Sequence, residues 1–381
     1  MFWLILLNFI SFSLGQLSAV SRSDGLNIYF FDIFLIFSNL TLFFYIMRRG
    51  KFKINFPLLT FIFFFLYSLI FTFSQIYYFD FLSILQSLSY LLRFSAYFIF
   101  GYFIYLLLSS KLLSTDQLKN IFVINFIFLT TLNLLQLVFL NNLTYLAQYG
   151  WDPHIGRLTG SFLDPNFMAF YLCIYYVLNN YFIKNKYLEY ISIFSIFLTL
   201  SRNGILTFLL LFLILNIKNF KKLIILFFCF LLFLIINPRI LDRFIQFQNS
   251  DDSSYQRVIS WNEALKLSNF NNFQGVGFNN YKNNLEFYRI NSLDSLKRNS
   301  VNSTDSSFLH VYVTLGFLGL ILVLVLLGGF MFKKGFIMLN TILLIGLFFN
   351  SQFINSLFYP QISVLLFCTL NLGIYLKESE F

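Results

Sequence analysis

Charge, histidine and cysteine are scarce in this chain, and their scarcity excludes several kinds of site. Only 11% of the 381 residues are charged, and there are two histidines, three cysteines and five prolines. His154 and His310 are too few for a histidine-rich metal site. Cys173, Cys229 and Cys368 all lie inside apolar runs, so we expect small core residues and neither a disulfide framework nor a thiolate metal site.

The familiar catalytic motifs are also missing. The sequence contains no GxxxxGK[ST] loop, no GxSxG elbow, no HExxH pair and no evident DxD motif for a nucleotide sugar. Catalysis, if the chain is an enzyme, must therefore depend on arginines and carboxylates, with no cofactor and no metal ion.

Apolar residues dominate what is present. They make up 58% of the chain, and the mean hydropathy of +0.75 lies far above the range of soluble domains. Stretches of roughly 17 to 25 apolar residues can cross about 30 Å of hydrocarbon. We therefore predict an all-α, polytopic integral membrane bundle of about twelve transmembrane helices, near residues 2–20, 27–47, 57–78, 83–108, 120–140, 166–183, 187–201, 204–217, 222–237, 308–332, 335–353 and 359–376. The first stretch lacks a basic n-region, which favours an uncleaved span over a signal peptide.

Lysine and arginine predict the orientation, because cytoplasmic loops are enriched in them. Every second short connection is basic, through Arg48, Arg49, Lys51, Lys53, Lys111, Lys119, Lys184, Lys186, Lys218, Lys221, Lys222, Lys333, Lys334 and Lys377. These connections and both termini are predicted to be cytoplasmic. Much of the net charge of +10 is then topological, and no nucleic-acid partner is implied.

Two outer segments are longer than the others and divide the chain. We expect residues 1–237 to hold the first nine transmembrane helices, with an outer loop at 141–165. Residues 238–306 form a large extracytoplasmic loop, and residues 307–381 hold the last three helices and a cytoplasmic C-terminus. In the large loop, SSYQRVISWNEALKL predicts a helix that begins at Ser253 or Ser254 and carries Arg257, Trp261 and Ala264 on one face.

The residues that could carry chemistry on the outer side are few. They are Arg157, Asp164, Asn166, Arg202, Arg257 and Asp305. A guanidinium binds phosphate through a planar fork and stays charged when partly buried, so converging arginines would suit a pyrophosphate. Each arginine taken alone could equally be an interfacial or salt-bridged side chain. Arg93 lies in the middle of a predicted span, where an inward-facing role is favoured.

Four motifs occur in order along the second half of the chain. They are GSFLDPNFMAFYL at 160–172, LTLSRNGIL at 198–206, YQRVISWNEALKLSNFNNFQGVGFNNY at 255–281 and TDSSFLHVYVTLGFLGL at 304–320. Together they resemble the O-antigen polymerase and ligase superfamily. The third motif matches through Arg257, Trp261, Ala264, Gly275, Gly277 and Tyr281, and the fourth through Asp305, Ser306, Leu309, Gly316 and Gly319.

The resemblance implies a membrane glycosyltransferase of the bacterial cytoplasmic (inner) membrane with its active site facing outward. Members use glycans carried on undecaprenyl pyrophosphate as donor and acceptor. By resemblance, Arg202 and Arg257 contact the pyrophosphate and Asp305 stands where the ligase branch has a histidine, so Asp305 is the expected base and the polymerase branch is favoured. His310 is the alternative base; its other interpretation is a hydrogen-bonded residue inside the bundle.

The remaining predictions concern substrate contacts and alternatives. We expect Arg157, Asn166, Arg93, Trp261 and His310 to contribute to substrate binding, with Trp261 able either to stack on a sugar or to sit at the membrane interface. A ligase that transfers finished polymer to a lipid or protein remains open, as does a lipid-linked oligosaccharide flippase. The sequence leaves open the sugars, the product (O-antigen or capsule) and whether a separate chain-length regulator binds.

Overall fold

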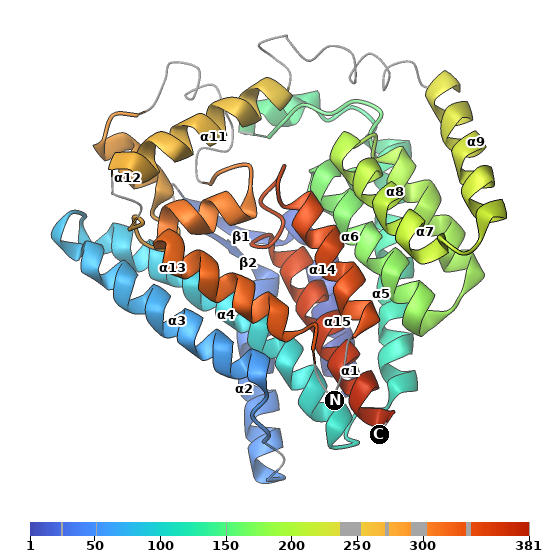
Figure 1. Cartoon of the computed structure of the whole chain (residues 1–381), viewed down its shortest axis with the longest axis horizontal. Helices are drawn as coiled ribbons and strands as arrows, with labels where there is room; N and C mark the ends of the chain where they lie inside the picture. Colours follow the sequence, from blue (N-terminus) through green and yellow to red (C-terminus); the bar gives the residue numbers. More distant parts are fainter. Residues whose placement is uncertain are drawn as a thin grey trace.

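The computed structural model describes residues 1–23, 26–50, 52–149, 151–236, 253–270, 274–290, 303–332 and 337–380. These residues form a helical assembly with one antiparallel hairpin (Figure 1). The helices are α1 Phe2–Ser13, α2 Phe30–Arg48, α3 Phe56–Ser74, α4 Phe81–Ser109, α5 Thr115–Phe139, α6 Pro165–Leu178, α7 Lys186–Leu198, α8 Arg202–Asn216, α9 Phe220–Ile236, α11 Ser253–Phe270, α12 Tyr281–Phe287, α13 Ser307–Gly329, α14 Met338–Asn350 and α15 Pro360–Ser379. The strands are β1 Ala19–Ser23 and β2 Leu26–Tyr29.

Each predicted span contains a helix, but the helices differ in length. Six helices of the described chain are long and apolar enough to cross a membrane, namely α2, α3, α4, α5, α13 and α15. Three shorter apolar helices, α1, α8 and α14, accompany them. At 1.5 Å per residue, helices of 12 to 15 residues rise only about 20 Å, less than the roughly 30 Å of hydrocarbon. The all-α membrane class is confirmed, and the count of twelve spans stays a prediction.

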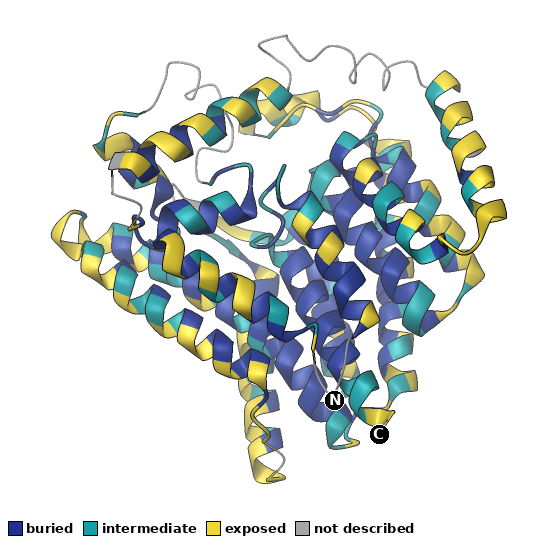
Figure 2. Ribbon diagram, in the orientation of Figure 1, coloured by how far each residue is buried: buried dark blue, intermediate teal, exposed yellow. Residues whose placement is uncertain are grey.

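Helices α4 and α15 form the centre of the assembly, where buried residues are concentrated (Figure 2). Gly101 of α4 lies directly against α15, because a Cβ there would come within 2.7 Å of the backbone carbon of Phe367. Helices α1, α2 and α3 contact this pair or each other on one side, and α6, α8 and α14 pack together on another. The helices therefore share one large apolar core, and a second, small apolar cluster lies between α11, α12 and α13.

The N-terminal region departs from the predicted span at residues 2–20. Helix α1 ends at Ser13, and the chain then turns into β1, which pairs with β2. The helix ends because Gly15 has a φ of +52° and lies against the carbonyl of Ser161, where a side chain would be only 2.6 Å from that oxygen. The hairpin was not predicted.

The helix predicted within the large loop is confirmed as α11, which begins at Ser253. Helices α11 and α12 lie at one end of the assembly, whereas both termini and the connection from α2 to α3 lie at the other (Figure 1). Within the predicted loop, residues 238–252, 271–273 and 291–302 lie outside the described residues.

Candidate active site

The first two motifs meet at the N-termini of α6 and α8. Asp164 caps α6, because its Oδ1 accepts hydrogen bonds from the backbone N–H groups of Asn166 (2.6 Å) and Phe167 (3.3 Å). Ser201 caps α8 by accepting from Gly204 N at 3.1 Å, and its hydroxyl donates to Asn166 Oδ1 at 2.7 Å. Arg202, the first residue of α8, is therefore held beside Asn166.

Small residues permit this approach of the two helices. A Cβ at Gly204 would lie 2.2 Å from the Cβ of Ala169, so no larger residue fits where α8 crosses α6. Burial raises the pKa of the Asp164 carboxyl, and the two backbone N–H donors only partly oppose that rise. Gly204 thus has a packing role and Asn166 holds the Ser201 cap, and both set the position of Arg202.

Arg157 braces the turn that precedes Arg202. Its Nε donates to the carbonyl of Thr199 at 3.0 Å, and its Nη2 donates to the carbonyl of Leu200 at 3.4 Å. Leu200 has a φ of +50°, a conformation that a leucine seldom adopts without support. The buried guanidinium also lies 3.4 Å from Nδ1 of His154. Its expected contact with substrate stays a prediction; these bonds favour a positioning role.

The third and fourth motifs meet where α11 lies over the start of α13. The backbone N–H of Asp305 donates to Ser260 Oγ at 3.2 Å, and Ser260 is one turn of α11 beyond Arg257. Ser306 caps α13 by accepting from Leu309 N at 3.4 Å. Arg257 and Asp305, both only partly buried, are thereby brought to neighbouring elements although they are 48 positions apart in the sequence.

The glycines of the third motif dock against a break in α13. Gly316 has a φ of +69° and interrupts the helix, which frees the carbonyls before it. The N–H groups of Val276 and Gly277 donate to the carbonyl of Thr314 at 3.0 and 2.8 Å, and the Tyr67 hydroxyl donates to the carbonyl of Leu315 at 2.9 Å. Broken helices in membranes persist where such groups find partners.

Residues 351–359, the connection between α14 and α15, join the two halves of the site. The N–H of Ser307 donates to the Ser351 carbonyl at 2.9 Å, and Leu357 N donates to Ser307 Oγ at 3.1 Å. On the other side, the Asn203 side chain donates to the carbonyl of Asn350 at 3.2 Å, immediately before this connection. Asn203, the residue after Arg202, is thus linked through residues 350 and 351 to Ser307, two residues after Asp305.

Aromatic rings of the same connection reach the remaining motifs. Tyr359 stacks on Phe167 with ring centroids 3.9 Å apart, and its hydroxyl donates to the Phe162 carbonyl at 3.3 Å. Phe353 lies against Trp261 of α11, with centroids 6.4 Å apart. The predicted sugar contact of Trp261 stays a prediction. All four motif segments therefore contact residues 350–359, which the sequence analysis treated only as a short connection.

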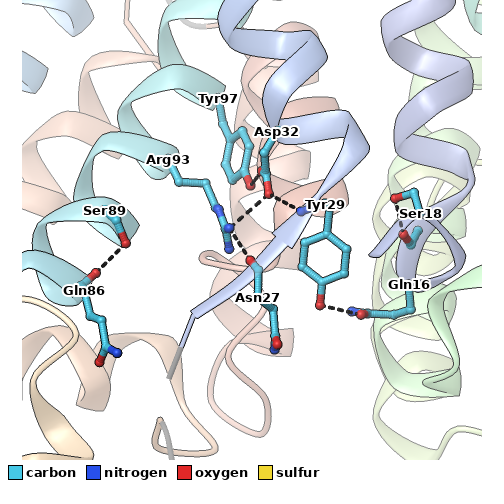
Figure 3. Close-up of polar contacts among 10 residues, drawn as sticks. Gln16, Ser18, Asn27, Tyr29, Asp32, Gln86, Ser89, Arg93 and Tyr97 are labelled. Atoms are coloured by element: carbon cyan, nitrogen blue, oxygen red, sulfur yellow. Dashed lines mark hydrogen bonds and ion pairs between the residues drawn. The ribbon is translucent and has the colours of Figure 1, made fainter. Parts of the chain in front are cut away.

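A cavity of about 370 Å³ lies beside this cluster and contains two of the predicted residues, Arg93 and His310, in its wall. Arg93 forms an ion pair with Asp32 at 3.0 Å, and their side chains are 14% and 9% exposed. Asp32 also accepts from the Tyr97 hydroxyl at 2.8 Å and from the N–H of Tyr29 at 3.3 Å (Figure 3). The guanidinium lies over the rings of Tyr90 and Tyr29, 5.1 and 5.8 Å from their centroids.

His310 is buried in the cavity wall between Tyr281 and Phe358, with ring centroids 6.1 and 5.8 Å away. Its Nδ1 has no hydrogen-bond partner among the described residues. Its role, as the alternative base or as a residue of the bundle, stays a prediction. Arg202, Arg257 and Asp305 do not line this cavity.

Asp32 is the residue that the sequence analysis missed. A signal was present, since YFFDIFLIF and LSYLLRFSAYF each place one charge, of opposite sign, within an apolar stretch. Charges in that setting usually pair. The structure accordingly gives Arg93 a partner from a helix 61 positions away.

The fold and this site define a multi-pass helical membrane protein with a polar cluster at one end. Residues 190–324 match the model of a family described as O-antigen ligase, a range that includes the second, third and fourth motifs. The resemblance to the O-antigen polymerase and ligase superfamily is confirmed over these residues. No curated protein and no solved structure matches the chain.

Proposed function

We propose that the protein is a polysaccharide repeat-unit polymerase of the bacterial cytoplasmic membrane. It would transfer a glycan from undecaprenyl pyrophosphate to a second lipid-linked repeat unit at the outer face, giving O-antigen or capsule. The observation that carries the proposal is a set of four hydrogen bonds between the motifs and residues 350–351, namely Ser201 to Asn166, Asn203 to Asn350, Ser307 to Ser351 and Asp305 to Ser260. It joins four motifs that are scattered over about 160 positions of the sequence.

The chemistry is a single displacement. A hydroxyl of the acceptor sugar attacks the anomeric carbon of the donor, the bond from that carbon to the pyrophosphate oxygen breaks, and the pyrophosphate leaves with the electron pair. Arg202 and Arg257 stabilise the charge that develops on the leaving group, the kind of electrostatic contribution that is usually largest in enzymes. Asp305 accepts the proton of the attacking hydroxyl. One displacement inverts the anomeric configuration.

Arg202 has a second advantage as a pyrophosphate ligand. It is the first residue of α8, whose N-terminal N–H groups carry partial positive charge. Arg157 holds the backbone turn that precedes Arg202, because it donates hydrogen bonds to the carbonyls of Thr199 and Leu200. The donor headgroup would then meet a fixed turn rather than a mobile loop.

Ligase activity is the second candidate, favoured by the description of the matching family. Asp305 at the position of the ligase histidine favours the polymerase. His310, five residues further along α13, would supply the base if the ligase interpretation holds. A flippase would have no need for residues that stabilise a leaving group.

Electrophoresis of the surface glycan from a deletion strain tests the proposal. Loss of the protein should collapse the ladder to a single repeat unit, and complementation with the wild-type chain should restore it. Long polymer that stays on the lipid carrier would identify a ligase. Repeat units that accumulate on the cytoplasmic side would identify a flippase.

A further inference from the structure

The cavity beside the motif cluster has the composition of a carbohydrate site. Six amide side chains from five separate segments line it, namely Gln16, Asn27, Gln86, Asn279, Asn283 and Asn355. An amide both donates and accepts hydrogen bonds, as a sugar hydroxyl does. Aromatic rings, among them Tyr90, Phe167 and Tyr359, complete the wall and offer faces on which a sugar ring can stack. The volume of about 370 Å³ falls within the range of small-ligand pockets.

Charges in this cavity oppose one another. Arg93 is paired with Asp32 at 3.0 Å, and it is held in addition by the carbonyl of Asn27. Among the described residues, the other charged members of the lining are Lys282 and Glu286, which have opposite signs and are four positions apart on α12. A pyrophosphate would need unopposed cations, and the arginines assigned to it, Arg202 and Arg257, are outside the cavity wall.

We propose that this cavity binds the neutral, hydroxyl-rich sugars of the acceptor glycan, while the pyrophosphate of the donor binds outside it. The inference rests on the proposed function and specifies its acceptor. Phe167 follows Asn166 directly, and Ser303 precedes Asp305 by two residues, so the cavity opens next to the proposed base. An acceptor sugar held there would present a hydroxyl toward the reacting centre.

A second cavity, also of about 370 Å³, adjoins the first at Gln16, which lines both. The Tyr29 hydroxyl donates to Gln16 Oε1 at 2.6 Å and so fixes the side chain at the boundary (Figure 3). Tyr149 and Trp151 lie in the wall of the second cavity. The acceptor chain continues into it, so that successive sugars pass from the rings around Arg93 to those of the outer segment 141–165.

Binding of a soluble acceptor to the purified full-length protein in detergent tests the inference. The probe is the repeat-unit oligosaccharide cut from the strain's own surface polymer, with neither lipid nor phosphate, so it can act only as an acceptor. Saturation-transfer NMR gives its affinity for the wild type, Tyr90→Ala and the matched control Tyr190→Ala. Tyr190 is exposed on α7, away from the cavity. Gln86→Ala replaces Tyr90→Ala if the latter does not fold.

Tyr90→Ala should weaken binding on the order of two- to tenfold, the effect of one lost ring contact. Tyr190→Ala and Arg202→Ala should bind as the wild type does, and saturating inorganic pyrophosphate should not displace the oligosaccharide. Quenching of tryptophan fluorescence by the oligosaccharide should decrease in Trp151→Phe and persist unchanged in Trp3→Phe. Three results would overturn the inference: unchanged affinity in Tyr90→Ala (or in Gln86→Ala where it replaces Tyr90→Ala), displacement of the oligosaccharide by pyrophosphate, or quenching that is unaffected by Trp151→Phe.

These failures are distinct from failure of the proposed function. If the deletion strain loses its polymer ladder but the cavity variants bind the oligosaccharide normally, only the acceptor assignment is wrong. If the ladder survives the deletion, the polymerase proposal is wrong whatever the cavity binds.

Discussion

At the scale of single residues, the arginines differ in what holds them. Arg93 is paired with a carboxylate and Arg157 with two carbonyls, whereas Arg202 begins a helix at the junction of two motifs. The sequence predicted that all three would matter but could not separate their roles. Their partners, Asp32, Thr199 and Leu200, come from other parts of the chain, and only the packing of the helices shows which guanidinium has which partner.

The buried pair of Arg93 and Asp32 gives a prediction on stability. Arg93→Met leaves the buried Asp32 carboxylate without its counter-charge, which should cost about 3 kcal/mol. Asp32→Asn combined with Arg93→Met removes both charges and should recover a large part of that loss. Thermal unfolding in detergent measures the stability of Arg93→Met, Asp32→Asn and the double variant. If the loss of stability in the double variant equals the sum of the losses in the two single variants, Arg93 and Asp32 are not directly paired.

The proposed base gives a prediction on pH dependence. Asp305→Asn should lower the polymerisation rate about 100-fold or more, since an amide cannot accept the proton. Asp305→His should restore part of the rate, and that rate should rise with pH through the ordinary histidine pKa of about 6.5, because only the neutral imidazole accepts a proton. The pH profile of polymer formation by each purified variant is the measurement. A flat profile for Asp305→His would remove residue 305 from the base role.

At the scale of elements, the apolar runs predicted where helices form but not how they end or break. The end of α1 depends on Gly15 meeting Ser161, and the break in α13 at Gly316 is satisfied by the N–H groups of Val276 and Gly277. Such contacts join distant segments, so periodicity along one segment does not reveal them. Residues 350–359 are rich in Asn and Ser although they join two apolar helices, and this was a weak sequence signal of their contacts with the motifs.

The docking of the glycine motif on α13 can be tested with a matched pair of glycines. Gly275 has a φ of +96°, and a Cβ there would lie 2.6 Å from Gly316 N. Gly275→Ala should therefore displace α11 and α12 from α13, and it should reduce both thermal stability and activity. Gly328→Ala, later in α13, meets no atom within 4 Å and should be neutral or slightly stabilising. Equal effects of the two substitutions on the melting temperature would refute the docking account.

At the scale of the whole molecule, the account requires a fixed orientation in the membrane. The charge pattern of the loops predicts that the basic connections are cytoplasmic and the motif cluster is outside. Helices α11 and α12 lie at the opposite end from both termini (Figure 1), as that prediction requires, and the orientation itself stays a prediction. Loop charge can be read locally along the sequence, whereas the helix lengths that determine the number of spans depend on how each helix ends.

Single cysteines can report the orientation. A membrane-impermeant maleimide applied to intact spheroplasts should label Tyr255→Cys on α11 but neither Lys53→Cys nor Lys218→Cys, all of which are exposed positions. The wild-type chain is the blank, because it measures any labelling of the three native cysteines, Cys173, Cys229 and Cys368. Permeabilised cells should label all three variants. Labelling of Lys218→Cys in intact spheroplasts would invert the proposed topology.

The most direct test of the central claim is polymerisation by the purified protein in detergent, supplied only with the lipid-linked repeat unit. The account predicts longer lipid-linked glycans, release of one undecaprenyl pyrophosphate for each bond formed, and an inverted anomeric configuration in the new linkage. Arg202→Ala should lower the rate by about 100- to 1,000-fold, whereas Arg49→Ala, in the exposed connection between α2 and α3, should leave it unchanged. Retention of configuration, or full activity in Arg202→Ala, would contradict the account.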